Sequence, residues 1–219
     1  MRWQDPVEGL IAPGRFIRVA EETGLITPIG NWVLQQTCHQ GQRWIEAGLP
    51  PLRLAVNLSA HQFLHSNIGQ VVAEALAQSG FPAARLELEL TESALMEREA
   101  EAIKILDQLR ALGVKLAIDD FGTGYSSLAY LKRLPLDILK IDKSFVDNLA
   151  HDPDDQAIAA TIIAMAQTLR LQALAEGVET QEQLDFLQAQ GCDMYQGYLT
   201  SAPVPADQFE QLLRARTLA

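Results

Sequence analysis

Polar residues with ligand or acid–base chemistry recur at the ends of short apolar runs along this 219-residue chain. They are Asn57, Glu89, Asp119, Asp120, Lys140, Glu176 and Gln196. Carboxylate and amide oxygens are hard ligands that suit Mg²⁺ or Mn²⁺, and neither histidine nor cysteine stands at these positions. The residue types therefore predict an oxygen-ligated cation site with a lysine beside it.

The adjacent pair Asp119 and Asp120 follows the apolar run Val114 to Ile118 and precedes the glycine-rich segment FGTGYSS. Like charges at the end of a buried run repel each other and are costly to remove from water. Bound cations would relieve that repulsion, and two neighbouring aspartates can serve two ions. Two cations close together activate a water and neutralise a phosphoryl oxygen during in-line displacement. The pair thus points to metal-assisted phosphoryl chemistry.

Six apolar runs are typical of β-strands, and amphipathic helical patterns lie between them. The expected strands span 53–59, 85–92, 114–120, 137–142, 171–177 and 192–200. The expected helices include 67–79, 97–112, 155–170 and 181–190. Thr180 and Gln183 form the pattern of a capping box that opens the last of these helices.

Strands that alternate with helices predict an α/β fold, with a parallel sheet and right-handed crossovers. The pattern favours a (β/α) barrel, with an open doubly wound sheet as the alternative. A (β/α)₈ barrel typically takes about 250 residues. Because the sequence shows six strands, two strands of such a barrel are expected to be missing.

The carboxyl ends of parallel strands meet at one edge of the sheet, where α/β proteins bind their ligands. Alternation along a strand puts Glu87 with Glu89, and Lys140 with Asp142, on the same side. Each residue also has a purely structural interpretation. A lone Asp or Asn after a strand often caps the next helix. Glu87 could simply be paired inside a barrel, and Lys140 with Asp142 could be a structural ion pair. Because six successive strands end in this way, one shared site is the favoured interpretation.

The composition is that of a soluble globular protein, with 48% apolar and 21% charged residues. A net charge of −11 and a pI near 4.8 argue against DNA or RNA as partners, which require a basic surface. Cys38 and Cys192 are too few for a disulfide framework. The sequence shows neither a signal peptide nor a membrane-spanning run. We therefore expect a cytoplasmic protein of one domain.

An ordered series of motifs gives the chain a resemblance to a known family. The motifs are RWQDPVEGLIAPGRFIRVAEETGLI, NLS, ELTES, DDFGTGYSSL, LKIDKSFV, AEGVET, QGY and SAPVP, which together cover essentially the whole chain. The chain resembles the EAL domain of bacterial cyclic di-GMP phosphodiesterases. This resemblance implies a modified (β/α)₈ TIM-like barrel that forms a single domain over residues 1–219. It also implies hydrolysis of cyclic di-GMP to linear pGpG by a two-metal mechanism with Mg²⁺ or Mn²⁺.

The same resemblance implies roles for individual residues. The implied metal ligands are Asn57, Glu89, Asp119 and, for a second ion, Asp120. Lys140 would steady the catalytic water, and Glu176 would be essential for catalysis. Glu179 would hold the DFGTGYSSL loop, while Arg2 and Gln196 would contact phosphate and guanine.

The chain departs from the family pattern at its start. The Glu-Ala-Leu tripeptide that names the family would end just before the position of Met1. The resemblance therefore implies a domain that is incomplete at its N-terminus, without the metal-binding Glu of that tripeptide and without the first two strands. A fragment of a longer protein, a late gene start and a degenerate domain would each explain this. The run Glu74-Ala75-Leu76 has the same letters but lies in a helical pattern, where a solvated glutamate is the favoured interpretation.

The leading functional hypothesis is hydrolysis of cyclic di-GMP. The alternative is a catalytically impaired domain that binds cyclic di-GMP or acts as a regulatory interaction domain. The retained set of site residues favours descent from an enzyme. A third hypothesis is a Mg²⁺ barrel enzyme of the enolase kind with Lys140 as base, and the QGY and DDFGTGYSSL segments argue against it. The resemblance also implies a homodimer and a place within a longer sensory protein.

Overall fold

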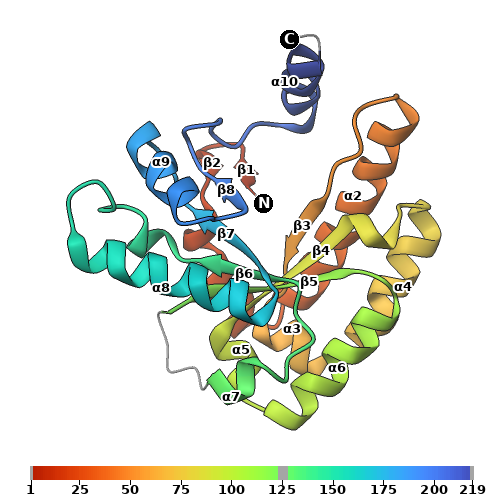
Figure 1. Cartoon of the computed structure of the whole chain (residues 1–219). Helices are drawn as coiled ribbons and strands as arrows, with labels where there is room; N and C mark the ends of the chain where they lie inside the picture. The colour runs from red at the N-terminus through yellow and green to blue at the C-terminus, as the bar shows by residue number, and fades with distance from the viewer. Residues whose placement is uncertain (1, 123–127, 218–219) are drawn as a thin grey trace.

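A computed structural model describes residues 2–122 and 128–217 of the chain. Its main sheet contains parallel strands in the order β3-β4-β5-β6-β7-β8. These strands are β3 (Leu54–Asn57), β4 (Leu86–Thr91), β5 (Lys115–Phe121), β6 (Ile138–Ile141), β7 (Gln172–Glu176) and β8 (Met194–Gln196). The order follows the sequence without the reversal that a doubly wound sheet requires. The sheet curls in the manner of a TIM-like barrel, as predicted (Figure 1).

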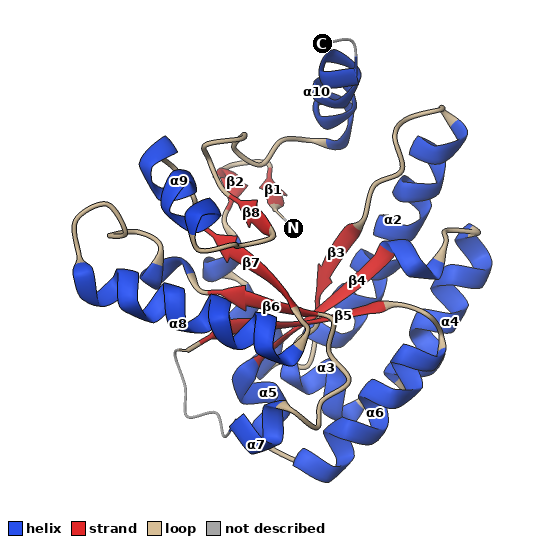
Figure 2. Cartoon of the chain, viewed as in Figure 1, coloured by secondary structure: helices blue, strands red, loops and turns tan. Residues whose placement is uncertain are grey.

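Helices surround the outer face of the curled sheet (Figure 2). The helices of the described residues are α1 (Ile17–Glu22), α2 (Ile26–Glu46), α3 (Ala60–His65), α4 (Ile68–Ser79), α5 (Glu92–Met96), α6 (Glu99–Ala111), α7 (Leu128–Leu131), α8 (Pro153–Leu169), α9 (Gln181–Ala189) and α10 (Ala206–Thr217), of which α10 stands apart from the sheet. Short 3₁₀ turns are η1 (Pro13–Arg15), η2 (Ala83–Arg85) and η3 (Lys143–Phe145). The expected helices match α4, α6, α8 and α9 to within two residues, and the capping box of Thr180 and Gln183 is present.

The sequence LELELT of β4 shows how the barrel divides its side chains. Leu86, Leu88 and Leu90 are fully buried in the hydrophobic core between the sheet and the helices. Because side chains alternate along a strand, Glu87 and Glu89 face the other way, into the barrel. Apolar burial outside the sheet therefore stabilises the fold, while the barrel interior carries charge.

The hairpin near the start of the chain and the helix α10 near its end both lie outside the predicted pattern. Strands β1 (Trp3–Asp5) and β2 (Gly9–Ile11) pair antiparallel in a hairpin. At the other end of the chain, Phe209 of α10 packs against Trp44 of α2 with ring centroids 5.2 Å apart. The two ends lie on the same side of the barrel (Figure 1). The hairpin was not predicted because strands of three residues carry almost no periodicity.

Within the described residues, β3 and β8 are the outer strands of the main sheet. Strand β3 pairs with β4 and β8 pairs with β7, and no backbone pairing joins β3 to β8. Glu74 is exposed on α4 and accepts a hydrogen bond from Gln70 (2.7 Å), as expected of a solvated helical glutamate. Across the described ranges, the helices are too short or too polar to traverse a bilayer.

Candidate active site

The register of the parallel strands brings the predicted residues to one edge of the barrel. Asn57 at the end of β3 is in register with Glu89 on β4. Across the sheet, Glu176 at the end of β7 is in register with Gln196 at the end of β8. Lys140 lies near the end of β6 between these pairs. The predicted meeting of strand ends is therefore present in the fold.

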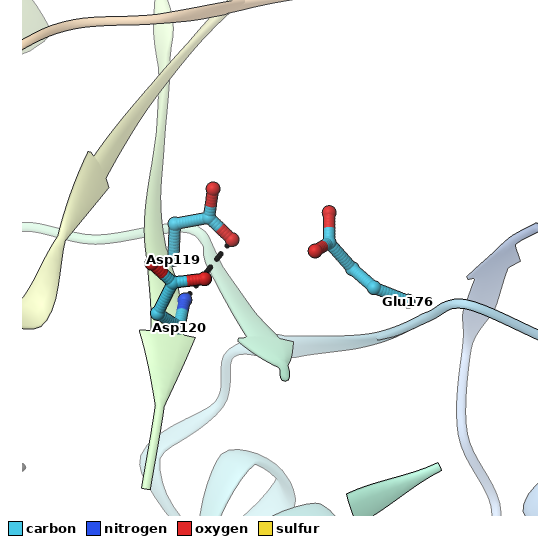
Figure 3. A group of neighbouring side chains, drawn as sticks. All are labelled: Asp119, Asp120 and Glu176. Carbon is cyan, nitrogen blue, oxygen red and sulfur yellow. Dashed lines mark hydrogen bonds between the residues drawn. The ribbon is translucent and has the colours of Figure 1, made fainter. Parts of the chain in front are cut away.

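Asp119 and Asp120 would point to opposite faces of a regular strand. The pairing of β5 with β6 instead shifts register between Ile118 and Phe121, and Asp120 has a left-handed φ of 53°. A bulge of this kind re-aims a side chain, and aspartate tolerates the left-handed region better than most residues. The N–H of Asp120 donates to Asp119 Oδ1 (3.0 Å). The two carboxylates lie side by side and face Glu176 (Figure 3).

Lys140 is the cation at the centre of the site. Its Nζ lies 2.9 Å from Glu89 Oε1 and 2.6 Å from Glu176 Oε1. A third carboxylate oxygen, Asp119 Oδ1, lies 3.0 Å from the same nitrogen. The lysine side chain is 2% exposed, so these contacts are shielded from water.

The alternative interpretation of Lys140 and Asp142 as a structural ion pair is not what the structure contains. The carboxylate of Asp142 caps η3 and accepts a hydrogen bond from the Ser144 N–H (3.0 Å). The partners of Lys140 are instead the carboxylates on β4, β5 and β7. Asp142 nevertheless lies beside the site, because its carboxylate interacts with Asp120 and contributes to raising the pKa of that residue.

Burial and neighbouring charge set the protonation of the site. Burial alone would lower the pKa of Lys140, but Glu89, Glu176 and Asp119 outweigh it and hold that pKa above its ordinary value. Burial raises the pKa of Glu89 and Glu176, and Lys140 opposes this shift. Burial and then the adjacent Asp119 raise the pKa of Asp120. The charged forms of Glu89, Glu176 and Asp120 are thus disfavoured in the site as it stands, and a bound cation would favour them.

An oxygen-ligated cation fits this donor set. Among the described residues, the group of metal-ligating side chains close enough to share one ion is Asp119, Asp120 and Glu176, whose nearest ligand atoms lie within 4.8 Å of one another. Glu89 approaches the same centre through Lys140. All of these donors are hard oxygens, which suit a divalent cation of the Mg²⁺ or Mn²⁺ type. Glu176, expected only as a catalytic residue, is thus also a possible ligand.

A comparison with family models identifies the chain. The EAL domain model matches residues 1–203. The chain belongs to the EAL family. It is 50% identical over 208 residues to the bifunctional diguanylate cyclase/cyclic di-GMP phosphodiesterase MucR of Pseudomonas aeruginosa, covering 95% of this chain and 30% of that protein. It is 49% identical over 215 residues to the cyclic di-GMP phosphodiesterase NbdA of the same species, covering 98% of this chain and 28% of that protein.

The fold agrees with solved EAL structures. A structure described as the PaMucR phosphodiesterase in complex with c-di-GMP superposes with a TM-score of 0.92 at 50% identity, covering 95% of this chain and 84% of that one. The EAL domain described here spans less than a third of the length of the two curated relatives. Those relatives are thus longer proteins that contain a region similar to this chain.

Three predicted site residues of this EAL domain lie outside the strand-end cluster of carboxylates. Gln196 is exposed on β8, and its backbone oxygen accepts from the Val178 N–H (3.1 Å). Arg2 is exposed directly before β1. Glu179 Oε1 lies 2.8 Å from Lys143 Nζ. The loop that Glu179 is expected to hold includes residues 123–127, which lie outside the described residues, so that role stays a prediction.

Glu92 is a buried residue of the site region that the sequence analysis did not select. Its Oε2 accepts a hydrogen bond from the Gly122 N–H (3.2 Å), directly after the bulge of β5. Thr91 caps α5 by accepting from the Ala94 N–H, which places Glu92 in the first turn of that helix. The motif ELTES contained a signal for Glu92, because a carboxylate directly after the end of a buried strand is costly to bury without a partner.

Proposed function

We propose that this EAL domain binds cyclic di-GMP and hydrolyses it to linear pGpG. The observation that carries the proposal is the convergence of Asp119, Asp120 and Glu176, with Lys140 among them, at the carboxyl ends of the barrel strands. The similarity to MucR and NbdA supports the same activity, because both are named as cyclic di-GMP phosphodiesterases. A c-di-GMP complex of the similar PaMucR structure supports the substrate.

The site would hold two Mg²⁺ or Mn²⁺ ions through Asn57, Glu89, Asp119 and Asp120, with Glu176 as a further oxygen donor. Bound cations would supply an activated water and neutralise charge on the phosphoryl oxygens. The raised pKa of Lys140 keeps its ammonium charged at neutral pH. Its three N–H donors face Glu89, Asp119 and Glu176, so cations that held one of these carboxylates would free a donor for the catalytic water. Arg2 and Gln196 would hold a phosphate and a guanine at the rim.

The second candidate is a domain that binds cyclic di-GMP without turnover. The observation that favours it is the open side of the sheet, where no backbone pairing joins β3 to β8 among the described residues. These two strands carry Asn57 and Gln196, one on each side of the opening.

Three further features belong to the same proposal. The domain is proposed to be cytoplasmic on the family resemblance. It is also proposed to belong to a longer sensory protein, because the similar regions of MucR and NbdA occupy less than a third of those proteins. Association as a homodimer is proposed on the family resemblance. Nucleic acid is not a proposed partner, since the chain has a net charge of −11.

The test incubates the 219-residue chain with cyclic di-GMP and Mn²⁺ or Mg²⁺ and separates the products by chromatography. Formation of pGpG that Asp119→Asn abolishes would support hydrolysis. Glu74→Gln is the matched control, because it changes an exposed glutamate on helix α4 that is not one of the strand-end residues of the site. Binding by calorimetry without product would support the second candidate. Neither binding nor product from a folded sample would reject both.

A further inference from the structure

The end of the barrel opposite the site contains an arginine with partners on three strands. Arg53 directly precedes β3, and its Nε lies 3.4 Å from Glu87 Oε2 on β4. Its Nη1 donates to Gln172 Oε1, the first residue of β7 (3.3 Å). Its Nη2 donates to Met194 Sδ, the first residue of β8 (3.1 Å). One guanidinium therefore connects β3 and β4 to β7 and β8.

These contacts lie where the sheet has no backbone ladder of its own. Within the described part of the chain, β3 pairs only with β4 and β8 only with β7, so hydrogen-bonded strands do not close the barrel between them. Arginine suits such a bridge because its planar fork presents several donors in fixed directions. A lysine at the same position would offer a single ammonium.

The ion pair with Glu87 holds the Arg53 guanidinium in place. The Glu87 side chain is 5% exposed and the Arg53 side chain 32% exposed, so the pair is largely removed from water. A buried carboxylate without a cation is strongly destabilising, whereas a fully exposed pair contributes little. Glu87 also lies two residues before Glu89 on the same face of β4, which connects the bridge to the site through one rigid strand.

We propose that Arg53 is a positioning residue of this EAL domain. Arg53 joins β3 and β4 to β7 and β8 at the amino ends of these strands. It thereby sets the separation of Asn57 and Gln196 at the carboxyl ends of β3 and β8. That separation is the span open to a bound nucleotide. The consequence for ligand binding rests on the proposed function, whereas the consequence for strand geometry does not.

The first experiment measures hydrogen exchange of the full 219-residue chain. Arg53→Met removes the fork and keeps an unbranched apolar side chain. It is expected to speed exchange several-fold in peptides covering Val178 and Leu199, whose amides form the backbone hydrogen bonds that attach the β8 segment. Lys115→Met is the matched control, because it breaks an ion pair of 2.6 Å at the same end of the barrel, between strands that the backbone already pairs.

In the control variant Lys115→Met, the exchange rates of the peptides covering Val178 and Leu199 are expected to equal those of wild type. Equal exchange of the β8 segment in Arg53→Met and wild type would overturn the proposal. So would a uniform increase across the whole chain in both variants, since that is a general loss of stability. Arg53→Lys is expected to exchange like Arg53→Met, because one ammonium cannot reach both Gln172 and Met194. If Arg53→Met does not fold, Met194→Leu removes a single acceptor and carries the same test with the same outcomes.

The second experiment measures cyclic di-GMP binding and turnover. Arg53→Met is expected to raise the Kd and KM several-fold with a smaller change in kcat. The reason is that the separation of Asn57 and Gln196 increases, while the carboxylates around Lys140 stay in place. Lys115→Met is expected to change neither constant. A wild-type chain that neither binds nor turns over the nucleotide would reject the proposed function, and the exchange data would still decide the role of Arg53.

Discussion

The ammonium of Lys140 lies 2.6 Å from Glu176 Oε1, and it contacts Glu89 and Asp119 as well. Lys140→Met would leave these buried carboxylates without their cation. We expect the free energy of unfolding without metal to fall by about 3 kcal/mol or more. Saturating Mn²⁺ should recover more stability in this variant than in wild type, because the ion replaces the lost charge.

Urea titrations with and without Mn²⁺ measure both effects. Lys115→Met is again the control, since its ion pair with Asp137 is partly exposed and its loss should cost no more than about 1 kcal/mol. A Lys140→Met variant as stable as wild type in metal-free buffer would show that the carboxylates do not need the lysine.

The left-handed backbone of Asp120 predicts opposite effects on stability and on metal binding. Asp120→Gly removes a carboxylate and relieves the strain of a non-glycine residue at a φ of 53°. We expect unchanged or higher thermal stability without metal, together with a smaller Mn²⁺-induced shift in melting temperature. Arg170→Gly is the control, because Arg170 has a φ of 62° at the end of α8, away from the site. That variant should gain stability and keep the full Mn²⁺ shift.

Gly197, directly after β8, lies too close to the Val178 backbone to carry a side chain. A Cβ at this position would overlap the backbone of Val178, which cannot move aside as a flexible side chain can. We expect Gly197→Ala to lower the free energy of unfolding by about 1–3 kcal/mol. Gly14→Ala, where no atom lies near the added Cβ, should have almost no effect. Equal melting temperatures for the two variants would contradict the close approach.

The buried thiol of Cys38 predicts slow alkylation. Burial raises the pKa of Cys38 to about 11, and the side chain has no exposed surface. Only about one thiol in a thousand is then ionised at pH 8, and the thiolate is the reactive form. We expect iodoacetamide to modify Cys38 only after unfolding in urea, as measured by mass spectrometry. Modification of the native protein within minutes would argue against this packing.

The parallel sheet could be predicted from the sequence because each strand combines two readable patterns. In β4 the leucines mark the face against the helices, and Glu87 and Glu89 mark the interior. The bulge at Asp120 could not be predicted, because it depends on how β5 pairs with β6. Nor could the contacts of Lys140 be predicted, since they depend on side chains from three other strands.

Most predicted site residues were found by their position at the end of a strand, which is a property of the chain alone, whereas Arg2 and Glu179 were predicted from the family resemblance. Glu92 was missed because its importance lies in a hydrogen bond to Gly122, thirty positions away. Arg53 was missed for the same reason, as its partners Gln172 and Met194 belong to the last two strands. Long-range polar contacts of this kind leave no periodic trace in a single sequence.

The division of β4 into an apolar outer row and a charged inner row has an evolutionary consequence. The leucine row holds the strand against the helices, while the glutamates of the inner row pair with Arg53 and Lys140 and can change only together with those partners. Selection can therefore alter the inner row, and with it the reaction, while the outer row preserves the shape of the domain. One inherited shape can therefore carry different interiors, because the residues that pack against the helices and those that face into the barrel alternate along the same strand.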